Sequence, residues 1–197
     1  MRFVFEMLSI SLYTVFVQNL IFSGGYGASE AVRMAAKPYR LALYCLSVTY
    51  FSLVTSAFCR ALDYVEFISN LNSAYHAAIF ACVLIVVYLL TALFFHLVFG
   101  AEPKYLSQLG ITALNTLVMS VPFINFSAGY SFTQSLGTAL GAGLAFFIAV
   151  LLIGAGMRKL AHSKEIPPVF QGTPIMFIYV ALLSLAFSGF SGAPLFA

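Results

Sequence analysis

Charged residues are scarce in this chain: Asp, Glu, Lys and Arg make up 8% of its 197 residues. Soluble domains carry about 25% charged residues, whereas 62% of this chain is hydrophobic. The formal net charge is +3 and the basic residues are scattered, so the chain lacks the basic patch of a nucleic-acid-binding protein. We therefore predict an integral membrane protein that contacts a lipid bilayer and no nucleic acid.

Motifs for catalysis and for metal binding are also missing. The three cysteines, Cys45, Cys59 and Cys82, are widely separated and each lies in an apolar run, which argues against a disulfide framework or a zinc site. The chain has no HExxH motif, no P-loop and no nucleophile elbow. We expect buried, inert thiols and no active site of the chain's own.

Long apolar runs, by contrast, are abundant, and a run of about 20 residues suffices to cross a membrane as a helix. Such runs lie at residues 3–22, 39–58, 74–99, 105 onward, 132–157 and 174–190. A short helix is expected at 29–37, where Pro38 ends it. In the fifth run, Gly137-x-x-x-Gly141 predicts close helix packing.

The first run leads directly into a polar, glycine-rich stretch. It contains Asn19, Ser23, Gly24, Gly25, Gly27 and Ser29. In hydrocarbon, backbone groups freed by a broken helix must be satisfied by the protein itself, so such a break is buried or lines a cavity. The alternative is that residues 24–27 are only the loop after the first span.

A second interruption follows about half a chain later, at Asn115 and Thr116 and again at 121–125, around Pro122. Two interrupted spans at corresponding places in two halves are typical of an inverted repeat with its site near the midplane. We therefore predict an all-α integral membrane protein in which six transmembrane helices form an inverted 3+3 repeat with helices 1 and 4 interrupted. It would be one membrane domain over 1–197, with repeat halves at about 1–100 and 101–197. The expected ion path or broken-helix site comprises Asn19, Ser23, Gly24, Gly25, Gly27, Ser29, Asn115 and Thr116.

Basic residues are divided unequally between the two ends of the predicted spans. The loops after spans one, three and five carry seven: Arg33, Lys37, Arg40, Lys104, Arg158, Lys159 and Lys164. The opposite side has two, Arg2 and Arg60. Because basic loops stay in the cytoplasm, we expect a multi-pass protein of a bacterial-type inner (cytoplasmic) membrane with both termini outside.

Two histidines lie on the third predicted span. His76 and His96 are twenty residues apart, which is about 30 Å along a helix. They are expected as interfacial histidines near opposite membrane surfaces, too far apart to share a metal. A proton relay stays open as the alternative.

The C-terminal third contains two segments of recognisable sequence, EIPPVFQG at 165–172 and ALLSLAFSGFSG at 181–192. They resemble the D-V-P-x-P-F-x-G segment and the L-M-S-L-A-F-x-G-F-S-G ending of the small membrane subunits of Rnf-type and Na⁺-pumping NQR-type electron-transport complexes. The resemblance extends over the whole chain and is strongest from Glu165 onward. With outward termini, the chain is most similar to the A-type subunit of Rnf.

This resemblance implies a membrane subunit of an ion-translocating electron-transport complex, partnered by other subunits of the complex and by an inverted homologous membrane subunit. In the family, two such subunits each contribute two cysteines to a [2Fe–2S] cluster held in mid-membrane. Counting from Asn19, the chain has Ser29 and Thr116 at those cysteine positions. Hydroxyls are poor iron ligands compared with thiolates. We therefore expect a structural or ion-path subunit that binds no cluster through its own side chains and no other metal.

Two alternatives stay open. A stand-alone transporter or channel for a small solute or ion would use the same broken helices. A redox subunit could also keep its cluster if a partner supplied the missing ligands. Gentle purification separates the stand-alone transporter from the complex subunits, because only the latter would retain partner chains.

Overall fold

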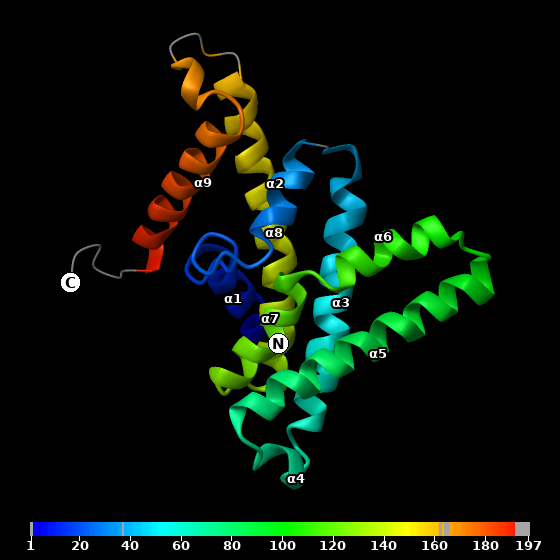
Figure 1. Cartoon of the computed structure of the whole chain (residues 1–197). Coiled ribbons are helices and arrows are strands. Elements are labelled where there is room, and N and C mark those ends of the chain that lie inside the picture. Colours follow the sequence, from blue (N-terminus) through cyan, green and yellow to red (C-terminus); the bar gives the residue numbers. More distant parts are fainter. Residues whose placement is uncertain (1, 37, 162, 164–165, 192–197) are drawn as a thin grey trace.

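The computed structural model describes residues 2–36, 38–161, 163 and 166–191, and the regular structure in these ranges is helical (Figure 1). The helices of the first half are α1 (Arg2–Phe16), α2 (Ala28–Ala36), η1 (Pro38–Arg40), α3 (Leu41–Leu62), α4 (Glu66–Ser69) and α5 (Ser73–Phe99). Those of the second half are α6 (Pro103–Ala113), α7 (Thr116–Ser127), α8 (Phe132–Ala161), η2 (Pro168–Phe170), α9 (Thr173–Ser188) and η3 (Gly189–Ser191).

Four helical stretches of the described chain are long and apolar enough to cross a membrane. They are Leu41–Leu62, Ser73–Phe99, Pro103–Ser127, which joins α6 and α7, and Phe132–Ala161. Two further apolar helices, Phe3–Phe16 and Thr173–Ser188, are shorter. The prediction of an all-helical membrane protein is thus confirmed at this coarser level.

Helix α8 occupies the centre of the molecule, and its small residues allow α1 to approach closely. A Cβ atom added to Gly137 would lie 2.7 Å from the carbonyl oxygen of Met7, and one added to Gly141 would lie 2.7 Å from that of Ser11. The Ser11 hydroxyl also donates a 2.8 Å hydrogen bond to the Gly137 carbonyl. The predicted close packing through Gly137-x-x-x-Gly141 is confirmed, with α1 as the partner.

Helix α3 packs on another face of α8 and runs antiparallel to it (Figure 1). A Cβ atom on Gly143 would collide with the side chain of Thr49, and the rings of Tyr44 and Phe146 stack with centroids 5.3 Å apart. Phe146 is fully buried. These contacts make α8 and α3 the scaffold on which the interrupted segments rest.

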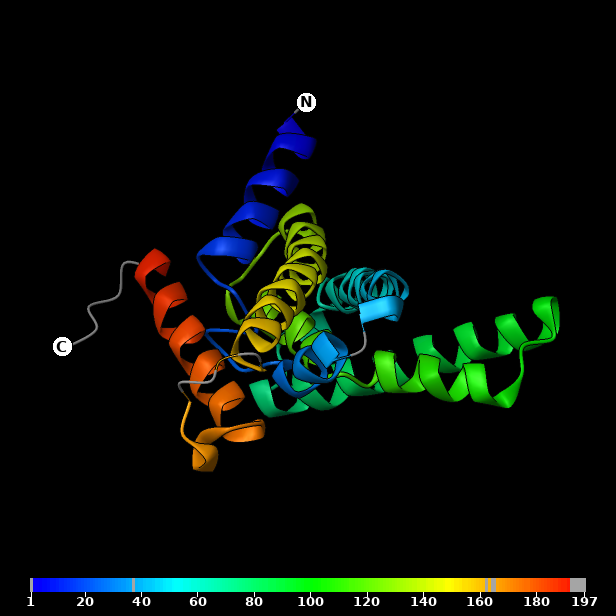
Figure 2. The same cartoon turned by 90° about the horizontal axis from the view of Figure 1, so that it is seen from above.

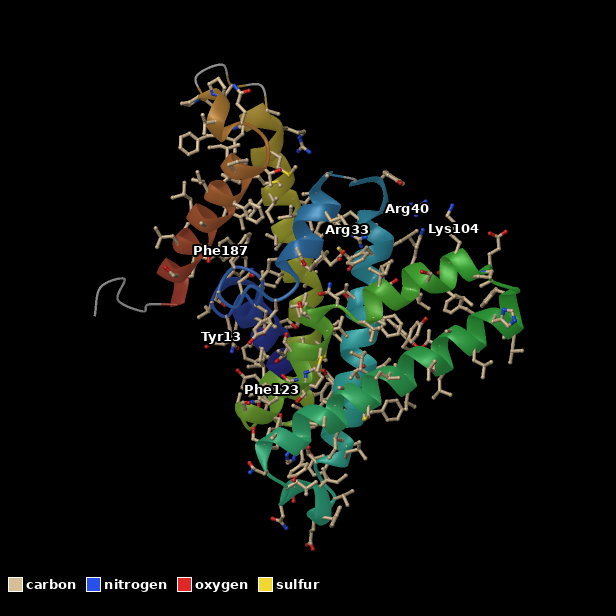
Figure 3. The ribbon with its side chains drawn as sticks, viewed as in Figure 1. Tyr13, Arg33, Arg40, Lys104, Phe123 and Phe187 are labelled. Carbon is tan, nitrogen blue, oxygen red and sulfur yellow. The ribbon has the colours of Figure 1, made fainter. Side chains whose placement is uncertain are left out.

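One helical pair and one single helix project from this scaffold on opposite sides. The α5–α6 hairpin reaches away from the bundle in both views (Figures 1 and 2), and its outer face is apolar and exposed, as at Leu97, which is 72% exposed. Helix α9 lies on the other side, where Phe187 packs on Phe22 with ring centroids 4.6 Å apart (Figure 3). The Ser184 hydroxyl donates a hydrogen bond to the Phe22 carbonyl. Exposed apolar faces of this kind suit lipid or a partner subunit.

The first helix ends earlier than the predicted limit at residue 22, because α1 stops at Phe16. Val17 and Gln18 both donate their N–H groups to the Tyr13 carbonyl, which terminates the regular helical pattern. Asn19 then begins a separate turn by accepting hydrogen bonds from downstream N–H groups. Asparagine competes with a helix in this way, because its side chain substitutes for a backbone acceptor.

The second predicted interruption is also shorter than expected. The chain breaks between α6 and α7, at Leu114 and Asn115, but α7 continues through Pro122 to Ser127. Pro122 is itself buried against the surrounding helices. Proline inside a membrane helix is tolerated in such surroundings.

Candidate functional site

The first break is organised by the side chain of Asn19, which is 1% exposed. Its Oδ1 accepts hydrogen bonds from the N–H groups of Ile21 and Phe22, both at 3.1 Å, and its Nδ2 donates to the Val15 carbonyl at 2.8 Å. Ser23 Oγ donates to the Asn19 carbonyl at 2.5 Å. One amide therefore satisfies three backbone groups at the point where the helix ends.

Two glycines carry the chain from this turn into α2. Gly25 and Gly27 have φ angles of 71° and 72°, in the left-handed region that side chains make unfavourable. The Gly25 N–H donates to the Ile21 carbonyl at 3.0 Å, and the Tyr26 N–H donates to the Leu20 carbonyl at 3.0 Å. Gly27 then precedes α2, and its carbonyl accepts from Ala31 at 2.9 Å.

The second break is organised by Asn115, which is 4% exposed. Asn115 is the N-cap of α7, and its Oδ1 accepts a 3.0 Å hydrogen bond from the N–H of Leu117. Its Nδ2 donates to the Tyr44 hydroxyl on α3 at 3.2 Å. A buried amide thus performs the same task at both breaks, holding free backbone groups where water is excluded.

The two breaks meet at the N-termini of α2 and α7. The Gly27 N–H donates a 2.9 Å hydrogen bond to Thr116 Oγ1, across 89 positions of sequence. A Cβ atom on Gly27 would lie 3.0 Å from Asn115 Oδ1 and 3.0 Å from the Leu117 Cβ. We call this meeting point, formed by residues 19–29 and 115–117, the junction. A side chain at position 27 would therefore require Asn115 and Leu117 to shift.

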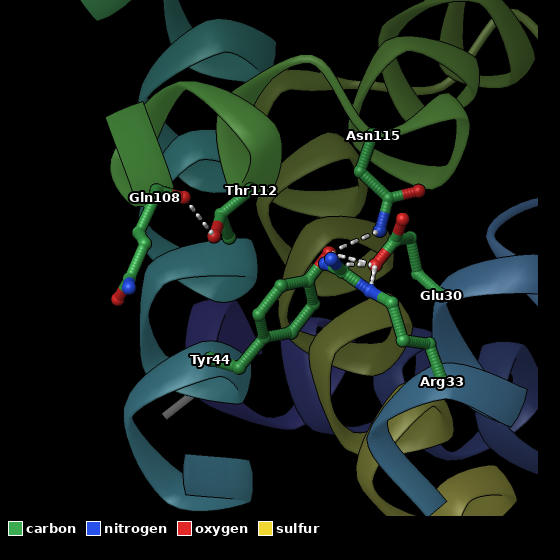
Figure 4. Close-up of polar contacts among 6 residues, drawn as sticks. All are labelled: Glu30, Arg33, Tyr44, Gln108, Thr112 and Asn115. Carbon is green, nitrogen blue, oxygen red and sulfur yellow. Dashed lines mark hydrogen bonds and ion pairs between the residues drawn. The ribbon is translucent and has the colours of Figure 1, made fainter. Parts of the chain in front are cut away.

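A charged pair from α2 lies beside the junction (Figure 4). Arg33 Nε donates to Glu30 Oε2 at 2.7 Å, and the Tyr44 hydroxyl lies 3.5 Å from the same oxygen. Tyr44 therefore links the Glu30–Arg33 pair to Asn115. Glu30 lies in the first turn of α2, where a carboxylate interacts favourably with the positive end of the helix dipole.

The structure brings most of the predicted site residues to the junction. Asn19, Gly27 and Asn115 are buried there, and Thr116 bonds directly to Gly27. The exposed members are Ser23, Gly24, Gly25, Ser29 and Thr116. Sequence analysis did not predict Tyr44 or the Glu30–Arg33 pair, because their role depends on how α2 and α3 pack around Asn115.

The chain matches one family over nearly its whole length. A family model described as "Rnf-Nqr subunit, membrane protein" covers residues 7–193. The chain belongs to the Rnf-Nqr family. This result confirms the resemblance that the C-terminal segments indicated.

Several curated relatives of this Rnf-Nqr chain are named as the A subunits of oxidoreductase complexes. The A subunit of the ion-translocating oxidoreductase complex of Syntrophotalea carbinolica is 29% identical over 193 residues, which is 95% of this chain and 97% of the relative. The protein of the same name in Vibrio cholerae is 29% identical over 192 residues, covering 95% and 97%. The A subunit of the Na(+)-translocating ferredoxin:NAD(+) oxidoreductase complex of Acetobacterium woodii is 25% identical over 193 residues, covering 96% and 98%.

A second polar cluster in this Rnf-Nqr chain lies away from the junction, at the opposite end of α3. His76 is fully buried, its ring stacks on Phe126 with centroids 3.9 Å apart, and its Nε2 lies 3.8 Å from Asp63 Oδ1. Arg60 Nη1 lies 3.6 Å from Asp63 Oδ2. His76 is therefore buried inside the protein, where Phe126 and Asp63 cover its ring, and its expected position near a membrane surface stays a prediction. The local sequence does not predict this burial, because one covering residue follows α3 and the other lies on α7.

Burial governs the charge of this cluster. It raises the pKa of Asp63 above its ordinary value, although Arg60 and His76 both oppose the shift. The Asp63 side chain is 5% exposed, so loss of hydration outweighs the opposing effect of these two neighbours. The cluster therefore contains a carboxyl group that the fold holds toward its protonated form.

Proposed function

We propose that this chain is the membrane subunit of an Rnf-like ion-translocating electron-transport complex, and that its junction is a structural joint that binds no iron–sulfur cluster. The first part rests on family membership and on relatives named as the A subunits of ion-translocating complexes. The second part rests on one observation, the hydrogen bond from the Gly27 N–H to the Thr116 hydroxyl. In the proposed joint, the Thr116 hydroxyl joins the two breaks by this hydrogen bond, at a position where the family resemblance implies a cluster ligand.

The side chains at the junction do not fit a [2Fe–2S] cluster. The two positions implied by the resemblance are Ser29 and Thr116, whose neutral hydroxyls are poor substitutes for thiolates. The chain's cysteines lie elsewhere, Cys45 and Cys59 on α3 and Cys82 on α5. Within the described residues, no three His, Cys, Asp or Glu side chains gather as a metal site. No redox step is therefore assigned to this chain's own side chains.

We further propose six spans arranged as an inverted repeat in one membrane domain, with halves at about 1–100 and 101–197. The support is that each half contains one break, and that both breaks are held by a buried asparagine, Asn19 or Asn115. The two breaks then supply the ion path or broken-helix site from Asn19, Ser23, Gly24, Gly25, Gly27, Ser29, Asn115 and Thr116.

The orientation with both termini outside an inner membrane is supported by where the cations lie. Arg33, Arg40 and Lys104 gather around the N-terminal end of α3 (Figure 3), whereas Arg60 lies near the other end of α3. Lys37 and Lys164, which also contributed to the predicted asymmetry, lie outside the described residues. The inverted homologous partner and the other complex subunits are proposed from family membership and from the exposed apolar faces of α5 and α9.

A stand-alone transporter is the second candidate, and one observation favours it. The breaks satisfy each other within a single chain through Gly27 and Thr116, so the junction does not need a partner to pair its backbone groups. Such a transporter would be stable as a single chain in mild detergent. The complex subunit would instead lose stability when its partners are removed.

Measuring iron and acid-labile sulfide in the purified chain tests the proposal that the junction binds no cluster. We expect both far below one cluster per chain, with no visible charge-transfer absorption. Stoichiometric iron and sulfide with such absorption would overturn the proposal. Ser29→Cys combined with Thr116→Cys, produced alongside the partner subunits, provides the positive control for cluster binding at these positions.

A further inference from the structure

A groove with two connected parts lies between α3 and the α5–α6 hairpin. The part nearer the basic end encloses about 680 Å³, and the part nearer the middle of α5 encloses about 520 Å³. Both parts are lined by Leu43, Ser47, Tyr105 and Leu109. The shared residues show that the two hollows adjoin, and we treat them as the two parts of one groove. Each part alone lies within the size range of about 300–1,000 Å³ typical of ligand pockets.

One end of the groove is cationic. Arg33, Arg40 and Lys104 line it together with one carboxylate among the described lining residues, Glu102 (Figure 3). Arg40 donates from Nη1 to the Oε1 of Gln108 on α6 at 2.9 Å, which holds its guanidinium across the mouth of the groove.

The basic side chains at this end outnumber the acidic ones. Arg33 is paired with Glu30, but in the part of the chain that the structure describes neither Arg40 nor Lys104 forms an ion pair. Both side chains are exposed. The groove therefore offers two unneutralised cations, one on each side of its mouth.

The other end of the groove is apolar and open to the surroundings. Its lining includes Leu46 on α3 and Leu90 and Phe94 on α5, which are 66%, 61% and 55% exposed. Because α3 and α5 are both long enough to span a bilayer, this part of the groove lies at the depth of the hydrocarbon. The polarity of the groove thus changes from cationic to apolar along the spanning helices.

We propose that this groove is a binding site for an anionic phospholipid, with the headgroup phosphate at Arg40 and Lys104 and an acyl chain along Leu46, Leu90 and Phe94. A free anion would use the cationic mouth alone and would leave the apolar part empty. A zwitterionic lipid would fill the apolar part, but its own ammonium group would lie near the two cations and its headgroup carries no net negative charge to offset them. Basic pockets between membrane helices bind anionic headgroups for this reason, and Tyr39 and Tyr105 beside the mouth suit the headgroup level.

Lipid retention by the complex, purified with its partner subunits, tests this proposal by native mass spectrometry. The probes are phosphatidylglycerol and phosphatidylcholine with identical acyl chains, offered in equal amounts. We expect preferential retention of phosphatidylglycerol, and a fall of about fivefold for Arg40→Gln and again for Lys104→Gln. Lys159→Gln removes the same charge from an exposed site on α8 that does not line the groove, so it should leave retention unchanged.

Two further measurements separate the lipid from other occupants. Ser47→Phe would obstruct the connection between the two parts, so it should weaken lipid retention without weakening competition by soluble glycerol phosphate at the mouth. Equal retention of both lipids, an equal effect of Lys159→Gln, or full displacement by glycerol phosphate would overturn the proposal. A lipid preference that is present in the separated chain and lost in the complex would also overturn the proposal, because a partner subunit would then occupy the groove.

Discussion

Replacing Gly27 by alanine tests the geometry of the junction, and Gly25→Ala is its matched control. Both glycines have left-handed φ angles, 72° and 71°, so each alanine pays about 1–2 kcal/mol of backbone strain. Around Gly25 nothing lies within 4 Å of an added Cβ, whereas at Gly27 that atom would be 3.0 Å from both Asn115 Oδ1 and the Leu117 Cβ. The two variants therefore differ in the junction contact and not in the backbone conformation.

The additional effect of Gly27→Ala can be worked out from the cap that it displaces. Moving Asn115 away from the new Cβ weakens its 3.0 Å hydrogen bond from the Leu117 N–H, and an N-cap of this kind is worth about 1 kcal/mol. The free energy of unfolding should fall by about 1–2 kcal/mol for Gly25→Ala and by about 2–3 kcal/mol for Gly27→Ala.

Thermal stability of the detergent-solubilised protein measures this difference. For chains of 150–250 residues, 1 kcal/mol shifts Tm by about 2–4 °C, so Gly27→Ala should melt about 2–4 °C below Gly25→Ala. The chain has no tryptophan, so the fraction that survives heating is best read by size-exclusion chromatography. Equal Tm values for the two variants would refute the close approach of Gly27 to Asn115.

Further expected outcomes concern the hydroxyl, the buried carboxyl and the topology. Thr116→Val removes the acceptor for the Gly27 N–H and should lower stability by about 1–3 kcal/mol, whereas Thr116→Ser should retain most of it; equal losses would contradict the bond. The pKa of Asp63 is raised by burial, so its stabilising contribution exists at low pH and is lost as the pH rises through the raised value. Asp63→Asn should therefore be more stable than the wild type at pH 7 but not at pH 4. Glu66→Gln, at an exposed position, is the control and should show no such difference. A wild type that is more stable than Asp63→Asn at pH 7 would contradict the stated effect of burial. Cysteines introduced as Ser163→Cys and Ala197→Cys should label from opposite sides of intact cells, although residue 197 lies outside the described residues, and labelling from one side would remove the proposed topology.

Local chemistry in the sequence was sufficient to predict the break regions. Glycines at 25 and 27 and asparagines at 19 and 115 are residues that end or cap helices, and the structure places all four at the junction. The spacing of Gly137 and Gly141 likewise predicted a close helix contact, because small residues on one helix face allow another helix backbone to approach.

Features that depend on distant packing could not be predicted in this way. The apolar run resumes at Leu20 after the two polar residues Gln18 and Asn19, so the exact end of α1 depends on the hydrogen bonds made by Asn19 and not on hydropathy. His76 is buried by Phe126, fifty positions later. The groove exists only because the α5–α6 hairpin diverges from α3 (Figure 2). The angle between the hairpin and α3 depends on tertiary packing and cannot be predicted from any one segment of the sequence.

The central claim is that this chain works as a membrane subunit of an Rnf-like complex. The most direct test is mild-detergent purification of the tagged chain from its native membranes, followed by mass spectrometry of the intact assembly. We expect fixed stoichiometry with flavin or iron–sulfur subunits and with a second, homologous membrane subunit. A monodisperse single chain that remains stable and folded without partners would contradict it and would favour the stand-alone transporter.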